Sequence, residues 1–173
     1  MSMQGPIAVV DADAALAATE GDHADRAIVV ERCVPAPAAQ LFRLWTTSDG
    51  LSGWLSPGAR VELQLGGAFE VLFDKSQPIG SQGSEGCRVL AFLEPRMLAF
   101  TWNAPPHLDR TRAQRTHVVV EFVPEGDSTL VRLTHAGWPD AAWTTEPEWP
   151  ETFSYFEAAW PRVLAALAEH ISG

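Results

Sequence analysis

Hydrophobic and polar residues alternate along seven segments of the chain, which is the pattern of strands with one buried face. The segments are residues 27–34, 59–65, 67–73, 86–94, 96–103, 116–125 and 128–137. Turn-forming residues separate the last six segments, and no long helical pattern lies between them. We therefore expect neighbouring strands to pair antiparallel in one seven-stranded sheet.

Apolar residues follow a helical period in three further segments. Residues 37–47 and 49–58 predict two short helices after the first strand. The third segment, about residues 149–171, has an apolar residue at every third or fourth position and predicts a long amphipathic helix. Pro161 lies inside it. Because a proline removes a backbone donor and clashes with the preceding turn, we expect a kink or break near residues 157–161.

The alternation also indicates which strand residues face the core. In the segment TLVRLTH, the residues Val131, Leu133 and His135 share the apolar side of the strand. A sheet of this size must cover its apolar face, and the C-terminal helix is the only predicted helix long enough to do so. The predicted fold class is therefore α+β. A bulky helix over a concave sheet also leaves room for an internal cavity.

Charge and composition narrow the kinds of partner. The formal net charge is -10, and residues 1–25 supply half of it, so we expect an acidic, flexible tail there and a single domain over residues 26–173. Nucleic acid and anionic lipid need a basic face, and no apolar run approaches the ~20 residues of a membrane span. Cys33 and Cys87 form no CxxC pair, which favours a reduced, cytoplasmic setting.

The histidines show none of the spacings of a metal site, so we expect no metal and no cofactor. His135 is interpreted either as a core or pocket histidine held by a hydrogen bond, or as a general acid/base. The first is favoured because no nucleophile motif such as GxSxG accompanies it. Arg110, Arg112 and Arg115 share one loop and form either a solvated hairpin tip or an electropositive lip for an anionic ligand.

Several stretches resemble a known family: ERCVPAPAAQLFRLWTTSDGLSGWL, LQLGGAFEVLF, LAFTWN, STLVRLTHAGW and AAWPRVLAALAEHI. Over residues 27–172 the chain is similar to the activator of heat-shock-protein-90 ATPase homologue domain, of the SRPBCC superfamily of START and birch-pollen-allergen relatives. The resemblance implies the helix-grip fold, a seven-stranded antiparallel sheet wrapped around a long C-terminal helix. It also implies a cavity that often holds apolar ligands, and it raises a chaperone partner and a stress response as further expectations.

We therefore predict that the chain binds a small, largely apolar molecule of lipid, polyketide or aromatic type between the sheet and the terminal helix. The predicted contacts are Trp54, Phe69, Phe73, Phe100, Trp102, His135, Trp138, Phe156 and Trp160. Two alternatives stay open. One is an enzyme that uses His135 as acid/base on a cavity-bound substrate, and the other is a co-chaperone-like protein-interaction module. Both a monomer and a homodimer fit the sequence.

Overall fold

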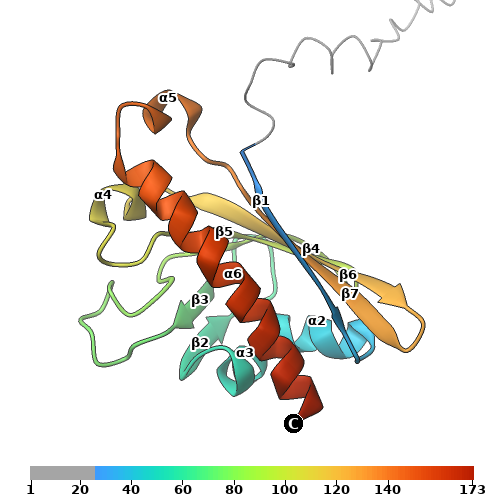
Figure 1. The fold of residues 1–173 in the computed structure, drawn as a ribbon. Helices are drawn as coiled ribbons and strands as arrows, with labels where there is room; N and C mark the ends of the chain where they lie inside the picture. The colour runs from blue at the N-terminus through green and yellow to red at the C-terminus, as the bar shows by residue number, and fades with distance from the viewer. Residues whose placement is uncertain (1–25) are drawn as a thin grey trace, which may run out of the picture.

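A five-stranded antiparallel sheet, a two-stranded sheet and one long helix build the fold of residues 26–173, the part of the chain that the computed structural model describes (Figure 1). The tail expected over residues 1–25 lies outside the described residues. The α+β class is confirmed. The short helices are α2 (Ala38–Thr46), α3 (Ser48–Trp54), α4 (Asp109–Arg112) and α5 (Asp140–Trp143), of which α2 and α3 were expected.

The larger sheet has the strand order β1-β7-β6-β5-β4, and every neighbouring pair is antiparallel. Its strands are β1 (Ile28–Val34), β4 (Val89–Leu93), β5 (Met97–Trp102), β6 (Thr116–Glu125) and β7 (Ser128–Ala136). The strands from β4 to β7 follow one another as a meander, as the absence of long helices between them predicted. The first strand then adds to the last, so the sheet brings β1 beside β7.

Strands β2 (Gly58–Val61) and β3 (Phe69–Leu72) pair with each other in a separate sheet, so the single seven-stranded sheet that we expected is divided in two. The sheets meet at one corner, where an isolated bridge pairs Ala68 with Arg88. Gly66 turns the chain shortly before that bridge with a φ of 74°, a conformation that glycine adopts without strain. Backbone hydrogen bonds also join Gly66, Gly67 and Phe69 to Val89 and Cys87 at this corner, while β3 itself forms its ladder with β2.

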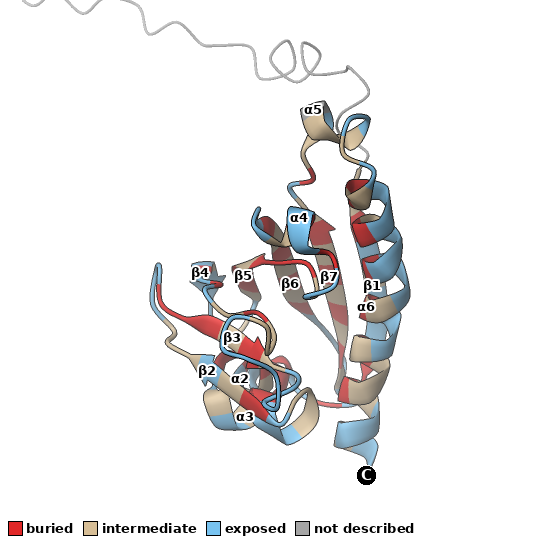
Figure 2. Ribbon diagram, turned by 90° about the vertical axis from the view of Figure 1, so that its left-hand side faces the viewer, coloured by how far each residue is buried: buried red, intermediate tan, exposed pale blue. Residues whose placement is uncertain are grey.

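The long helix α6 (Glu148–Ser172) lies across the inner face of the sheet, and Figure 2 shows its buried residues on the side that faces the strands. The helix runs through Pro161 without interruption, so the break expected there is wrong. Pro161 and Glu157, whose carbonyl loses its usual partner, are both exposed. Water can therefore replace the missing donor while the buried stripe of the helix stays packed.

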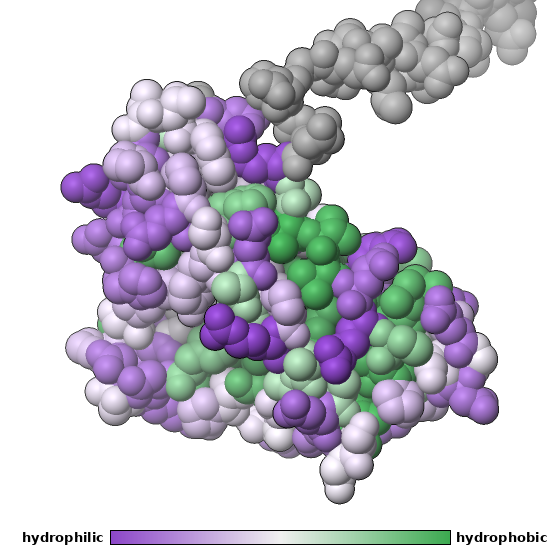
Figure 3. All heavy atoms as spheres, viewed as in Figure 1, coloured by the Kyte–Doolittle hydropathy of each residue, from purple (hydrophilic) through white to green (hydrophobic). Residues whose placement is uncertain are grey.

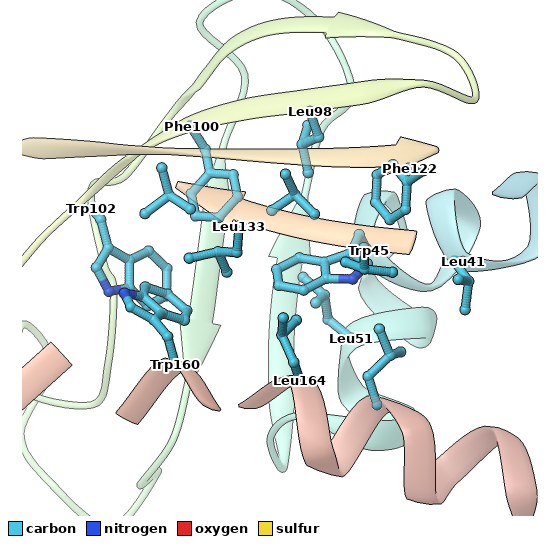
Figure 4. Close-up of a cluster of buried hydrophobic side chains, with 14 of the residues drawn as sticks. Leu41, Trp45, Leu51, Leu98, Phe100, Trp102, Phe122, Leu133, Trp160 and Leu164 are labelled. Atoms are coloured by element: carbon cyan, nitrogen blue, oxygen red, sulfur yellow. The ribbon is translucent and has the colours of Figure 1, made fainter. Parts of the chain in front are cut away.

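The core lies between α6, the inner face of the sheet and the two helices α2 and α3. The inward-facing residues of β6 and β7 are those that the alternation predicted: Val118, Val120, Phe122, Val131, Leu133 and His135. At the end of the core near α2 and α3, Figure 4 shows Leu164 of α6 reaching toward Trp45 and Leu51. This end is closed by close packing of apolar side chains.

The surface of the described chain is mixed. Hydrophobic residues gather along β1 beside α6 (Figure 3), and Val29 of β1 is 57% exposed. On the outer face of the sheet, Arg132 of β7 forms ion pairs with Glu31 of β1 and Glu121 of β6. Within residues 26–173, no helix is both long and apolar enough to cross a membrane.

The assignment of α6 as the cover of the core predicts the effect of a charge at Leu164, which has no exposed surface. Leu164→Asp buries an unpaired carboxylate, so we expect the free energy of unfolding to fall by more than about 3 kcal/mol. Ala158→Asp, at an exposed position of the same helix, is the matched control and is expected to lose about 1 kcal/mol or less. Urea unfolding measures both, and equal losses would contradict the assignment.

Candidate functional site: an aromatic cavity under the terminal helix

A cavity of about 410 Å³ lies between the N-terminal half of α6, the end of β5, and the loops that contain residues 73–83 and 103–106. The side formed by α6 and β5 is largely apolar, with Trp102, Phe156, Trp160 and Val163 in its wall. The loop side carries polar residues. The cavity therefore has two chemically different walls.

The apolar wall is built by rings that the helix and the sheet hold in register. Phe156 and Trp160 are four residues apart on α6, so they lie on one face of the helix, and their rings stack at a centroid distance of 5.7 Å. Trp102, at the end of β5, meets Trp160 at 5.6 Å, and Figure 4 shows the two side chains pointing toward each other. An apolar molecule in the cavity would contact these ring surfaces.

The loop wall, formed by residues 73–83 and 103–106, is fixed by an arginine and a glutamate that form hydrogen bonds to its main chain. The guanidinium of Arg112 donates to the carbonyl oxygens of Ala104, Gly80 and Gly83, and it lies 3.4 Å from a carboxylate oxygen of Glu85. The Glu85 carboxylate accepts three backbone N–H groups of the loop, from Gly80, Gln82 and Gly83, each at 2.8 or 2.9 Å. Burial alone would raise the pKa of Glu85, but these bonds outweigh it and lower the pKa.

These contacts of Arg112 bear on the loop of Arg110, Arg112 and Arg115, which the sequence left as either a solvated hairpin tip or an electropositive lip. Arg112 is neither a solvated tip nor a free cation on a lip, because its side chain is only 13% exposed and its donors are used inside the protein. Arg110, by contrast, is 66% exposed and lies 3.4 Å from Glu146. Arg115 donates to the carbonyl of Glu85 and to that of Arg112. The cluster mainly fastens the loop wall to the segment that leads into β6.

His135 lies on the inner face of β7 with no exposed surface, and both of its ring nitrogens have partners. Its Nδ1 accepts a hydrogen bond from Trp160 Nε1 at 3.0 Å, and its Nε2 lies 2.7 Å from Thr116 Oγ1. An indole N–H can only donate, so Nδ1 must be the unprotonated nitrogen. Nε2–H therefore donates to the hydroxyl of Thr116, which fixes a single neutral tautomer.

The protonation state of His135 follows from this environment. Burial, and to a smaller degree the nearby His117, lower the pKa of His135 to about 3, so the ring is neutral at physiological pH. His135 is not among the residues that line the cavity, since Trp160 separates the two. The lining residues that it contacts are Trp160 and Phe156.

The other predicted contacts divide between the cavity and the core. Those that line the cavity are Phe73, Trp102, Phe156 and Trp160. Those that pack elsewhere are Trp54, Phe69, Phe100 and Trp138. Phe69 and Phe100 stack on each other at 3.9 Å within the core, and Trp54 packs on Trp45 at 5.1 Å. Trp138 donates from its Nε1 to the carbonyl of His135 and packs on Phe153 of α6.

Sequence reasoning missed the polar lining, which includes Asp74, Gln77, Gln82 and Asn103. Asp74, Gln77 and Gln82 lie in a loop without periodicity, so no pattern indicated their direction, and Asn103 is the last residue of a segment that we expected to be a strand. The one available signal was the density of Gly, Ser, Gln and Asp in the long loop after residue 73, which is typical of a structured turn region. In the described part of the chain, no group of three or more His, Cys, Asp and Glu residues is placed to hold a metal ion.

Comparison with known proteins now connects this geometry to a family. The family described as "Activator of Hsp90 ATPase homolog 1-like protein" matches residues 35–172. The chain belongs to this family. The resemblance found in the sequence is thereby confirmed. Among curated proteins, none matches the sequence.

Solved structures of several proteins share the fold. Protein MLL2253 from Mesorhizobium loti superposes with a TM-score of 0.67 at 23% identity, over 85% of this chain and 97% of that one. CalU16 from Micromonospora echinospora has a TM-score of 0.60 at 21% identity, over 84% and 76% of the two chains. The Aha1 dimer from Colwellia psychrerythraea has a TM-score of 0.59 at 15% identity, over 84% and 95%. At these identities the likeness shows the fold alone.

The contacts of His135 predict that it stabilises the junction of sheet and helix. His135→Phe keeps a ring of similar size but leaves the buried Trp160 N–H and Thr116 hydroxyl without their partner. Each such loss costs about 1–3 kcal/mol, so we expect the free energy of unfolding to fall by about 2–4 kcal/mol. The matched control is His170→Phe, at an exposed position near the end of α6, which should change stability by less than about 0.5 kcal/mol. Unchanged urea unfolding of His135→Phe would contradict the network.

The low pKa of His135 also predicts a pH dependence of stability. In the unfolded chain the imidazole regains its usual pKa of 6.5, so the unfolded state binds a proton before the folded state does as the pH falls. The contribution of the neutral His135 to the free energy of unfolding is therefore complete above pH 6.5 and is lost progressively toward pH 3. Over this range the free energy of unfolding falls by up to about 1.4 kcal/mol per pH unit. His135→Phe should remove this slope between about pH 4.5 and 6.5, where most carboxylates are still ionised. Parallel profiles for wild type and variant would be the contrary result.

Proposed function

We propose that this protein binds a small, largely apolar molecule in the cavity between the sheet and the N-terminal half of α6. The observation that carries the proposal is the cavity itself, whose volume of about 410 Å³ falls within the range of small-molecule sites. Its α6 and β5 side presents ring surfaces rather than catalytic groups. Membership in a family whose fold commonly holds hydrophobic ligands supports the same assignment.

The arrangement of the wall supports a binding role over the enzymatic alternative. Phe156 and Trp160 are fixed by stacking and by the bond to His135, so the apolar surface is formed before a ligand arrives. An acid/base role for His135 would require one ring nitrogen to leave its partner and the ring to pass Trp160. The geometry therefore favours retention of an apolar molecule, and the ligand types that we keep are lipid, polyketide and aromatic.

The binding proposal predicts that filling the cavity abolishes binding without unfolding the protein. Ala159 lines the cavity from α6, so Ala159→Trp places a large ring inside it. We expect the affinity for a neutral aromatic probe, 2-naphthylmethanol, to fall by at least about tenfold, because the ring occupies the volume that the probe needs. Isothermal titration calorimetry measures the affinity, and circular dichroism checks that the variant is folded.

The neighbouring residue provides the control for this experiment. Ala158 is exposed on the same helix, so Ala158→Trp adds the same ring outside the cavity and should leave the affinity unchanged. If wild-type protein gives no heat with the probe and no protection against unfolding by it, the binding proposal is wrong. The same holds if both variants bind as well as the wild type.

Partners other than a small molecule stay predictions. The family description names an activator of the Hsp90 ATPase, and one similar structure is described as an Aha1 dimer. These words concern the relatives, and they support a test for a chaperone partner and for a homodimer in this chain. Light scattering after size exclusion would distinguish a monomer from a homodimer, and a pull-down with Hsp90 would test the chaperone. The link to stress rests on the same resemblance, whereas the cytoplasmic setting is a prediction from Cys33 and Cys87, which form no CxxC pair.

A further inference from the structure

The polar wall of the cavity uses several of its hydrogen-bond donors within the protein. Gln77 Nε2 donates to the Asp74 carboxylate at 3.0 Å, Gln82 Nε2 donates to the carbonyl of Gln77 at 2.9 Å, and Asn103 Nδ2 donates to the carbonyl of Gly83 at 3.4 Å. The amide oxygens of these three side chains receive no hydrogen bond from any described residue. Since an amide oxygen can only accept, this wall offers acceptors to a molecule in the cavity.

The charged residues of the loop wall also favour a ligand that donates hydrogen bonds. Arg112, the only cation of this wall among the described residues, is engaged by three carbonyl oxygens and faces the carboxylate of Glu85. Asp74 is the other charged lining residue, and no described cation forms an ion pair with it. The neighbouring Lys75 packs its side chain against Gly58 of β2 and does not line the cavity. The Asp74 charge is therefore the one left uncompensated at the cavity.

Asp74 is held as an anion by its own turn. The hydroxyl and the backbone N–H of Ser76 both donate to its Oδ1, at 2.6 and 2.9 Å, and the amide of Gln77 donates to its Oδ2. These bonds, those to the side chains of Ser76 and Gln77 first, lower the pKa of Asp74 below its usual value. The carboxylate is thus charged at neutral pH and fixed in position within the loop.

Aromatic rings flank this acceptor wall. Phe73, next to Asp74, is 47% exposed, and its ring lies edge-on to Trp102 at a centroid distance of 6.4 Å. Tyr155 of α6 also lines the cavity and is 43% exposed. The faces of such rings attract cations, while an anion placed near them gains nothing comparable. Ring faces, amide oxygens and one carboxylate together form a setting suited to a positively charged donor.

We infer that the ligand of the proposed site is an amphiphilic amine, with its apolar part against Trp102, Phe156 and Trp160 and its ammonium group at the loop wall beside Asp74. This inference rests on the proposed function and adds the chemical class of the ligand. An ammonium brings the donors that the amide oxygens and the carboxylate lack. A carboxylic acid of the same size would meet the Asp74 charge, and the positive charge of Arg112 is already shared by three carbonyl oxygens and the Glu85 carboxylate.

Three naphthalene derivatives of matched size test the ligand class on the full chain by isothermal titration calorimetry at neutral pH. They are 2-naphthylmethylamine, which is a cation, 2-naphthylmethanol, which is neutral, and 2-naphthoate, which is an anion. We expect the amine to bind at least about tenfold more tightly than the naphthoate, with the alcohol between them. The difference should shrink as salt is added, because the carboxylate at the loop is exposed to solvent.

Asp74→Asn then locates the source of this preference. The variant keeps an acceptor for the turn but removes the charge, so the ratio of amine to naphthoate affinity should fall to within about threefold of unity. Asp127→Asn, in the exposed turn between β6 and β7, makes the same change of net charge far from the cavity and should leave the ratio unchanged.

The possible results separate the two proposals. If none of the three compounds binds to wild-type protein, the proposed function itself is wrong. If the alcohol binds but the amine and the naphthoate have equal affinities, the cavity is a binding site and the amine inference is overturned. An unchanged ratio in Asp74→Asn, or an equal loss of ratio in Asp127→Asn, also overturns it, because the preference would then not come from the loop wall. Circular dichroism confirms that both variants are folded.

Discussion

The apolar inner face of the five-stranded sheet has to be kept from water along its whole length, and a single helix does most of this. Toward its C-terminal end, α6 packs Leu164 and Leu167 tightly, with α2 and α3 filling the remaining space. Toward its N-terminal end, α6 faces the loops of residues 73–83 and 103–106 in addition to α4 and α5, and the polar atoms of these loops do not fill the space in the same way. One requirement, the covering of the sheet, thus produces a closed core at one end and a cavity at the other.

A directional contact fixes how the helix lies on the sheet. Packing of apolar side chains alone permits small shifts of one element along another, whereas a buried hydrogen bond tolerates few. Trp160 Nε1 bonds to His135 on β7, and His135 bonds onward to Thr116 on β6. Because Trp160 is also part of the cavity wall, the shape of the cavity is tied to the register between α6 and two central strands. A polar group in the core thereby shapes an apolar site that it does not touch.

Features that depend on neighbouring positions in the chain were predictable. The inward faces of β6 and β7 and the stripe of α6 follow from local period, and the structure confirms them. Features that depend on distant residues were not. The partners of His135 lie 19 and 25 residues away, and only the folded sheet brings them together. The division of the sheet near Gly66 and the direction of the loop residues around Asp74 likewise depend on tertiary contacts. Alternation shows that an aromatic residue faces inward, but not whether it faces the cavity or the closed core, so the sequence predicted more aromatic residues at the cavity than the structure places there.

The way in which the loop wall is fastened bears on how such a site can diversify. Arg112 holds the loop by carbonyl oxygens, and Glu85 holds it by backbone N–H groups, so nearly all of these bonds go to the main chain. Gly80, with a φ of 95°, and Gly83, where a Cβ would lie 1.8 Å from the carbonyl oxygen of Val71, have to stay glycine. The bonds to the main chain do not depend on which side chains Ser81 and Gln82 carry. Substitutions there can alter which chemical groups face the cavity while the wall keeps its position. The site therefore separates the residues that set its architecture from those that set its selectivity, which leaves selectivity free to change during evolution.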